Sequence, residues 1–384
     1  MNEEQFLLRN FSKYYQKAHI EVERIAEREF GFGSREKKIV ARHMAFSGNE
    51  QLRNKLVNEP PFYVSYSAAF YERPDGRPMD KKGWKSAQVI FDIDAHHVGE
   101  LFVCEKCMQW AKDSTIRLVE DFLMADFGLR KEELKVNFSG NRGFHVHVKN
   151  SAFEQLSKEE RRELADYITA TGLDSRQLFK EGKVTTDVID GYVISKKTLR
   201  GPTPSTHGYG GRIVKALQKN NYFGVAKAKR LQAIERTIAK GNWFFFKDVA
   251  KKKFAQVIAK CIQLARVDID VNVTADTGRL IRLPNSIHGS SGLIAKKLDF
   301  TVLQKFNPLD DAVVFGANEL EIVPTIDIKD VYMKGQTFSF EKDKKAKMPG
   351  YLAVYLLCKK VAILPIHENF PNEPHRMLNA SVEA

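Results

Sequence analysis

The spacing of apolar residues changes along the chain, and these changes predict an alternation of helices and strands. Apolar and aromatic residues recur at helical spacing from Phe6 to Ala18, and the pattern continues from Ile20 to Phe30. Glycines at positions 31 and 33 interrupt the pattern, so we expect helical structure to end there. Residues 62–67 alternate in the way that is typical of a strand. The N-terminal region therefore predicts helix first and strand second.

The apolar run Val89–Asp94 predicts a core strand that carries two carboxylates. Side chains two positions apart share one face of a strand, so Asp92 and Asp94 point the same way. Two like charges held this close repel each other and lose hydration. A divalent cation such as Mg²⁺ or Mn²⁺ would offset that cost, because these hard ions prefer carboxylate oxygens. The alternative is an edge strand that exposes both acids to water.

Five later segments have the spacing of amphipathic helices. The first has Ser114 as a candidate N-cap and Gly128 as a candidate C-cap. Ser157 and Glu160 fit a capping box at the start of the second. The predicted helices cover residues 112–127, 157–170, 176–183, 230–240 and 254–264.

The charged helices in the middle of the chain indicate an inserted unit. We interpret residues 156–255 as a mostly helical insertion subdomain, because this stretch predicts charged helices separated by a loop rich in Gly, Pro and Thr at residues 201–211. The core is then discontinuous. It is predicted to comprise residues 1–155 together with 256–340, and residues 341–384 are predicted to form a C-terminal extension.

A polar turn joins two strand-like segments within residues 135–148. The turn at residues 139–143 contains the hydroxyl of Ser139, the guanidinium of Arg142 and two glycines that let a ligand approach the backbone. His145 follows on the second strand. Together these groups suit the binding of a polyphosphate. The alternative is an ordinary hairpin with a polar tip.

A third source of carboxylates lies at residues 267–273, which predict another strand. Asp268 and Asp270 would share one face of that strand, so either acid is a candidate partner for the first pair. The same segment leads into a turn region that carries Arg282 and His288. It therefore brings further cationic groups to the candidate site.

The amino-acid composition indicates what kind of molecule the protein binds and in which environment it works. Lys and Arg number 61 against 48 Asp and Glu, which gives a formal net charge of +13. This excess favours a polyanionic partner such as nucleic acid. The four cysteines are too few for a disulfide scaffold. The N-terminus is acidic and no apolar run is long enough to span a bilayer, so we expect a soluble, cytoplasmic protein that does not bind membranes.

A Cys-x-x-Cys pair raises the question of a structural zinc ion. Cys104 and Cys107 follow His96 and His97 closely, and such a set suits tetrahedral zinc because a tight turn presents both thiolates to one ion. Two alternatives are cysteines that behave as small apolar residues in the core and a redox-active pair.

Taken together, the motifs resemble the small catalytic subunit of the archaeal and eukaryotic DNA primases, and the archaeal members more closely. The resemblance extends from Arg28-Glu29-Phe30 to about Phe300. It rests on three motifs that occur in the family's order. They are Phe91-Asp92-Ile93-Asp94, Phe138-Ser139-Gly140-Asn141-Arg142-Gly143-Phe144-His145, and the segment from Asp270 through Arg282 to His288-Gly289.

The resemblance implies a role for each matching residue. It makes Asp92, Asp94 and Asp270 the metal-binding triad, while Asp268 stays an alternative third ligand. Cys104 and Cys107 match the family's zinc knuckle, for which His96 or His97 would supply a further ligand. The implied nucleotide-binding residues are Ser139, Arg142, His145, Arg282, His288 and Arg42.

The resemblance also implies a fold and an activity. The fold would be the α/β primase fold, with a mixed sheet flanked by helices and a helical inserted subdomain. The activity would be the synthesis of short RNA primers, or of DNA primers, on single-stranded DNA by two-metal nucleotidyl transfer from nucleoside triphosphates. The expected partner is the primase large subunit. The alternatives are a stand-alone primase-polymerase, a repair polymerase of the same superfamily, and an inert nucleic-acid-binding subunit.

Overall fold

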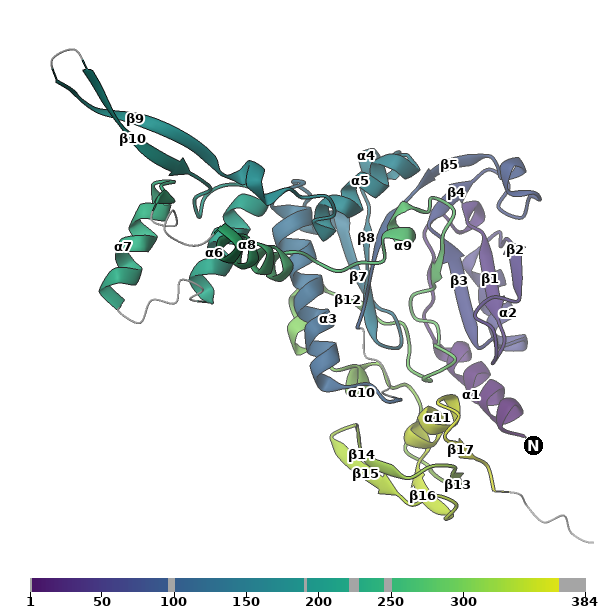
Figure 1. Cartoon of the computed structure of the whole chain (residues 1–384). Coiled ribbons are helices and arrows are strands. Elements are labelled where there is room, and N and C mark those ends of the chain that lie inside the picture. The colour runs from purple at the N-terminus through teal and green to yellow at the C-terminus, as the bar shows by residue number, and fades with distance from the viewer. Residues whose placement is uncertain (1, 96–100, 190–191, 221–227, 245–250, 366–384) are drawn as a thin grey trace, which may run out of the picture.

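Two four-stranded sheets face each other at the centre of the molecule (Figure 1). The computed structural model describes residues 2–95, 101–189, 192–220, 228–244 and 251–365. The strand pairs of both sheets are antiparallel. The first sheet has the order β11 (Leu280–Arg282), β3 (Tyr63–Ser67), β1 (Phe30–Gly33) and β2 (Ala41–Met44). The second has the order β12 (Lys297–Leu298), β7 (Leu134–Phe138), β8 (Gly143–Val148) and β6 (Val89–Asp94).

The second sheet separates an apolar face from a polar one. Phe91 of β6 lies opposite Val146 of β8, which in turn lies opposite Val136 of β7, and all three side chains are buried. One register step away, Asp92 lies opposite His145. Because side chains alternate along a strand, this polar row belongs to the other face of the sheet. The strands predicted at residues 89–94 and within 135–148 are thereby confirmed.

Helix α3 (Glu105–Arg117) packs against β6 and β8 and continues in π-helical form from Leu118 to Met124. The helix predicted at residues 112–127 is therefore confirmed, but its start was predicted too late. Cys104 is the N-cap, and Ser114 is buried inside the helix. Gly128 has a φ of 68°, the left-handed conformation that suits the predicted C-cap.

The N-terminal helix α1 (Glu3–Lys17) packs against α2 (Asn49–Asn58) and confirms the first predicted helix. The predicted continuation over residues 20–30 is wrong. Only a short 3₁₀ turn forms there, at Ile25–Glu27, and Phe30 already begins β1 opposite Tyr66 of β3. Pairing with a distant strand has prevailed over the local helical spacing.

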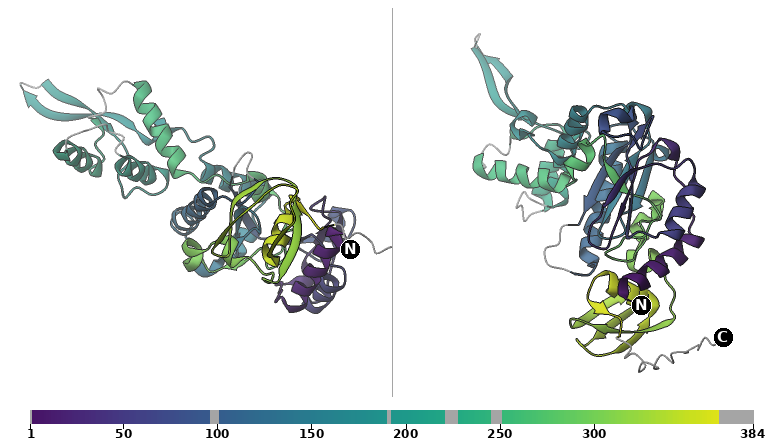
Figure 2. Two further views of the ribbon diagram at one scale, coloured as in Figure 1. Left: turned by 90° about the horizontal axis from the view of Figure 1, so that it is seen from below. Right: turned by 90° about the vertical axis from the view of Figure 1, so that its right-hand side faces the viewer.

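The middle of the chain contains a long hairpin as well as helices. Residues 176–183 were predicted as helix, but a single 3₁₀ turn at Ser175–Leu178 gives way to β9. This hairpin projects away from the two sheets (Figures 1 and 2). The other helices predicted in this region are confirmed, whereas the domain boundaries stay a prediction. The elements are α4 (Ser151–Glu154), α5 (Lys158–Thr169), β9 (Lys180–Ile189), β10 (Tyr192–Arg200), α6 (Tyr209–Lys219), α7 (Ala228–Ala239) and α8 (Lys251–Ala265).

The C-terminal strands surround a fully apolar helix, α11 (Gly350–Cys358), which lies beside α1 (Figure 2). Every residue of α11 from Tyr351 to Cys358 is buried. None of the helices within the described ranges has the length and apolar character needed to cross a bilayer. The remaining elements are β4 (Ala69–Tyr71), β5 (Trp84–Ala87), α9 (Val271–Ala275), α10 (Pro308–Asp311), β13 (Glu319–Pro324), β14 (Ile328–Met333), β15 (Gln336–Phe340), β16 (Ala346–Pro349) and β17 (Ala362–Ile363).

Candidate active site

Strand β6 places the first two predicted carboxylates on the polar face of its sheet. The strand lies at the sheet edge, but α9 and the residue before it cover this edge. The Asp270 backbone N–H donates to the Asp92 carbonyl over 3.0 Å, and the Thr274 hydroxyl donates to the Ile90 carbonyl over 3.1 Å. As a result the Asp92 side chain is only 16% exposed. The alternative was an open edge strand with both acids exposed to water. Only Asp94 is exposed, so this alternative is wrong for Asp92.

The third carboxylate is not on a strand, contrary to the sequence-based expectation for residues 267–273. Asp270 is the N-cap of α9, and its Oδ1 accepts from the N–H groups of Asn272 (2.9 Å) and Val273 (3.2 Å). An aspartate at the N-cap accepts hydrogen bonds from backbone N–H groups of the first helical turn, which have no partner within the helix. Asp268 instead pairs with Arg266 over 2.9 Å. Of the two candidates, Asp270 is the one whose charge acts on Asp92.

The electrostatics of Asp92 fit a cation ligand. Burial, and then repulsion from Asp270, raise the pKa of the Asp92 carboxyl to about 6. Its Oδ1 lies 3.5 Å from His145 Nε2 and has no hydrogen-bond partner among the residues that the structure describes. A buried carboxylate oxygen without a partner is uncommon in proteins and suits a metal ion that completes its shell.

The protein groups would hold such a cation only in part. Across the described part of the chain, no three His, Cys, Asp or Glu side chains form a closed metal cage. Mg²⁺ commonly binds through one or two carboxylates and takes its remaining ligands from water and substrate phosphates. The arrangement around Asp92 therefore fits an ion that shares its ligands with a phosphorylated substrate.

A cavity of about 340 Å³ lies in front of these carboxylates, between the two sheets. It brings together both acids of β6 and most of the predicted nucleotide-binding residues, which come from distant parts of the sequence. The polar side chains that line it are Lys38, Arg42, Ser65, Asp92, Asp94, Ser139, Asn141, His145, Asp276, Arg279, Arg282 and His288.

The turn between β7 and β8 forms one wall of this cavity. Ser139 Oγ accepts from the N–H groups of Asn141 (3.4 Å) and Gly143 (3.2 Å), which fixes the turn. Gly140 has a φ of 87°, and a Cβ there would lie 2.7 Å from His288 Cβ. Glycine is thus required on both backbone and steric grounds. Arg142 does not line the cavity, since its Nη2 donates to the Leu101 carbonyl over 3.4 Å.

The predicted histidines and Arg282 are held in buried positions around the cavity. Burial lowers the pKa of His145 to about 4 and that of His288 well below its usual value. Both imidazoles are therefore neutral at pH 7 in the absence of a bound anion. Burial also lowers the pKa of Arg282 to about 10, so its guanidinium stays charged. It lies 4.8 Å from the ring centre of Tyr63 and donates to the Val64 carbonyl over 3.3 Å.

Arg42 reaches the cavity from the first sheet because a buried carboxylate holds it. Its Nε and Nη2 donate to the two oxygens of Glu29 over 2.8 and 3.3 Å. The His43 N–H also donates to Glu29 Oε1, and Lys82 Nζ lies 3.3 Å from Oε2. Burial alone would raise the pKa of Glu29, but hydrogen bonds and positive charge from Arg42 and Lys82 lower it. Glu29 therefore serves as the anchor of this cationic group.

Sequence reasoning missed several residues of the cavity. Lys38, Asp276 and Arg279 line it, and Arg279 lies in the segment that had been singled out for Arg282. Their charges lacked a spacing pattern that would have distinguished them from solvated surface residues. Glu29 stands where the family resemblance begins, but nothing in the local sequence indicated that it binds Arg42.

The two cysteines of the proposed zinc site are adjacent in space. Cys104 Sγ accepts from the Cys107 N–H over 3.4 Å, and the two sulfur atoms are 2.9 Å apart. The two thiols are therefore in direct contact with each other. His96 and His97 lie outside the described residues. The zinc site accordingly stays a prediction.

Comparison with known proteins identifies the family to which this chain belongs. A family model described as the DNA primase small subunit matches residues 91–300. The protein named DNA primase small subunit PriS from Methanothrix thermoacetophila is 32% identical over 93% of this chain and 98% of its own length. Its counterparts from Methanosarcina barkeri and Thermoplasma acidophilum are 32% and 30% identical over 95% and 92% of this chain, and over 98% and 99% of their own lengths. The chain belongs to the DNA primase small subunit family, and both the predicted family and the α/β fold class are confirmed.

Proposed function

We propose that this chain is the catalytic subunit of a DNA primase, a nucleotidyltransferase that synthesises short RNA or DNA primers on a single-stranded DNA template. The observation that carries the proposal is the position of the unpartnered Asp92 oxygen in the cavity that Ser139, Arg282 and His288 also line. Carboxylates for a cation and donors for a triphosphate thus meet in one place. The family membership supports the same enzyme class.

Asp92, Asp94 and Asp270 would hold Mg²⁺ or Mn²⁺ in this proposal. Bound there, the ions supply the charge neutralisation at the phosphates and the activation of the attacking hydroxyl that two-metal nucleotidyl transfer requires. His145, which is neutral and largely buried, lies 3.5 Å from the Asp92 carboxylate. The side chain of Asp270 is fixed as a helix cap, which keeps its charge beside Asp92.

The donors of the cavity would bind and orient the incoming nucleoside triphosphate. Arg282 is a buried, charged donor, and His288 lies next to the Gly140 turn. Arg42 approaches from the opposite sheet and is already oriented by Glu29. Because these groups are held in place before the substrate arrives, they stabilise charge on the phosphates with little reorganisation. Positioning and electrostatics would supply most of the rate enhancement.

A primer-synthesis assay tests the proposal against its alternatives. The full chain is incubated with a single-stranded template, labelled nucleotides and Mg²⁺ or Mn²⁺, with and without the primase large subunit that we expect as its partner. Products made without a supplied primer support the proposal. Extension of supplied ends alone would indicate a repair polymerase instead. The absence of product with and without the large subunit would favour an inert nucleic-acid-binding subunit.

A further inference from the structure

The polar face of the second sheet continues beyond the candidate active site. His147 follows His145 on the same face of β8, and Lys135 of β7 lies opposite His147. Asn137 lies opposite His145, and Lys297 of β12 lies opposite Asn137. The face that is acidic at β6 therefore becomes basic toward β12.

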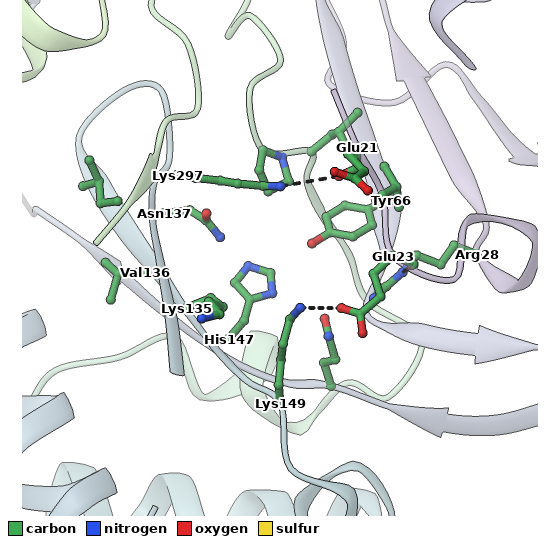
Figure 3. Close-up of a pocket in the computed structure, with 15 residues that line it drawn as sticks. Glu21, Glu23, Arg28, Tyr66, Lys135, Val136, Asn137, His147, Lys149 and Lys297 are labelled. Carbon is green, nitrogen blue, oxygen red and sulfur yellow. Dashed lines mark hydrogen bonds and ion pairs between the residues drawn. The ribbon is translucent and has the colours of Figure 1, made fainter. Parts of the chain in front are cut away.

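A separate cavity of about 480 Å³ opens at this basic end (Figure 3). Its size lies within the range of small-molecule sites in proteins. Apolar walls come from Val22, Leu283 and Pro284. Five polar or charged residues of its lining are buried, and three lysines stand around it. The buried residues are Arg28, Tyr66, Gln88, Asn137 and His147, and the lysines are Lys135, Lys149 and Lys297.

His147 is the strongest sign that the cavity has a ligand. Its side chain points into the cavity between Asn137 and Lys149 (Figure 3). The residue is 2% exposed, and its Nε2 has no hydrogen-bond partner within the described ranges of the chain. Burial holds the pKa of His147 well below its usual value, so the ring is neutral and can either donate or accept. A buried polar atom of this kind requires a partner that the protein does not provide.

The cavity has a net positive charge, because four cationic side chains outnumber the carboxylates of Glu21 and Glu23 in its lining. Lys149 pairs with Glu23, while Lys297 Nζ donates to the backbone carbonyl of Glu21 over 3.4 Å. Loss of hydration, and then the charge of Lys149, lower the pKa of Lys297. The ammonium groups of Lys149 and Lys297 repel each other, so an anion bound between them would stabilise both charges. The mouth thus suits phosphate groups.

The inner part of the cavity suits a ring rather than a further anion. The Tyr66 and His147 rings are stacked, with centroids 6.4 Å apart and an interplanar angle of 22°. Asn137 and Gln88 add directional donors and acceptors near an apolar wall. This combination of a hydrogen-bonding interior and a cationic rim matches a heterocyclic base that carries phosphates.

We propose that this cavity binds a nucleotide, with the base beside His147 and Tyr66 and the phosphates at Lys135, Lys149 and Lys297. The site is distinct from the substrate cavity in front of Asp92, since the two cavities share no lining residue. The burial of its polar interior favours a small molecule over a nucleic-acid strand.

Binding of ATP to the full chain without template tests this inference, and isothermal titration calorimetry in Mg²⁺ counts the sites. We expect two ATP molecules per parent chain and one per Arg282→Ala chain, in which the substrate cavity is impaired. In the Arg282→Ala background, Lys297→Glu should weaken the remaining site about tenfold or more, because it removes one charge-assisted contact and adds a repulsive charge. Lys13→Glu, at an exposed position on α1, is the matched charge control and should bind as its background does. Equal binding by the Lys297→Glu and Lys13→Glu chains would overturn the proposal.

A second variant separates a nucleotide from a simpler ligand. His147→Phe keeps a ring of similar size but removes Nε2, so it should weaken ATP about tenfold and leave tripolyphosphate unchanged. Equal affinity of the Arg282→Ala chain for ATP and tripolyphosphate would show that the cavity binds oxyanions alone. Displacement of this ATP by single-stranded DNA would assign the cavity to the template. Both of the last two results would overturn the proposal, and neither depends on primer synthesis. Where His147→Phe does not fold, Lys297→Glu decides.

Discussion

The backbone N–H of Asp270 donates to the carbonyl of Asp92 over 3.0 Å. One hydrogen bond thus fastens the segment that carries the third carboxylate to the strand that carries the first. The same contact closes the free edge of β6, so stability of the sheet and assembly of the carboxylates depend on one local arrangement. Residues that are 178 positions apart in the sequence reach one site in this way.

Replacement of single carboxylates tests the assembly around Asp92. Asp92→Asn and Asp270→Asn should abolish primer synthesis, because each removes an anionic ligand while keeping the size of the side chain. Asp92→Asn should also stabilise the metal-free protein, since it removes repulsion between buried charges. Asp268→Asn is the matched control and should stay active, because Asp268 pairs with Arg266. Thermal unfolding in EDTA and primer synthesis measure the two effects. An inactive Asp268→Asn beside an active Asp270→Asn would reverse the assignment.

The two arginines Arg142 and Arg282, both predicted to bind nucleotide, should differ in their effect on nucleotide binding. Arg282 lines the substrate cavity, whereas Arg142 donates to the Leu101 carbonyl. A charge-assisted contact contributes about 1.5–3 kcal/mol. Arg282→Ala should therefore weaken binding of a nucleoside triphosphate about tenfold to a hundredfold, and Arg142→Ala should weaken it less. Competition against a fluorescent nucleotide measures both. A larger loss for Arg142→Ala would show that the turn rearranges when substrate binds.

Glu29 should control both stability and the position of Arg42. Glu29→Gln leaves the fully buried Lys82 ammonium without its counter-charge, which should cost about 3–5 kcal/mol of unfolding free energy. It also releases Arg42, so the KM for nucleotide should rise. Urea unfolding and steady-state kinetics test these outcomes. Glu72→Gln, at an exposed carboxylate on the same part of the chain, is the control and should change neither.

The ionisation of Glu29 should also make the stability of the protein depend on pH. The pKa of Glu29 is lowered in the folded protein, so its contribution to stability is complete above the ordinary glutamate pKa and is lost as pH falls through the folded value. Unfolding free energy should therefore decline on acidification below about pH 4.5. Glu29→Gln should make this decline shallower. An identical pH profile for parent and variant would contradict the role of Glu29 as a charged anchor.

Substitution of two glycines with positive φ distinguishes the effect of backbone strain from that of a steric clash. Gly140 and Gly128 have φ values of 87° and 68°, but only at Gly140 would a Cβ meet another side chain, that of His288. Gly128→Ala should cost about 1 kcal/mol of stability and leave activity unchanged. Gly140→Ala should cost more and lower primer synthesis about tenfold or more, because His288 must move. Equal activity of the two variants would show that His288 has no role in the reaction.

The zinc hypothesis is tested by metal content. If Cys104 and Cys107 hold a structural ion, Cys104→Ser should lower the bound zinc and the melting temperature while Mn²⁺ still binds at the aspartates. Cys261→Ser, at a buried cysteine remote in sequence from the pair, controls for the loss of a thiol. Zinc content that is equal in the Cys104→Ser chain and the parent would exclude the site.

Local sequence determined the elements whose signals do not depend on distant contacts. The period-two pattern of Val89–Asp94 specified a strand with two acids on one face, and the capping box at Ser157 specified the start of α5. The glycines of the 139–143 turn specified a hairpin. The aspartate strand and this turn, together with the segment from Asp270 to Gly289, were sufficient to identify the family. In each case the determining interactions lie within a few residues of one another.

Tertiary structure alone decided which charged groups meet and what form the ambiguous segments take. Residues 20–30 do not form the predicted helix, because Phe30 pairs with Tyr66 in a sheet. Residues 267–273 do not form the predicted strand, because Asp270 caps a helix. The choice between Asp268 and Asp270, and the binding of Arg42 by Glu29, depend on contacts between separate elements. Burial, which sets the pKa of Asp92 and leaves His147 without a partner, is likewise a property of packing. A linear pattern carries no information on these distances, because they arise only when distant segments pack together.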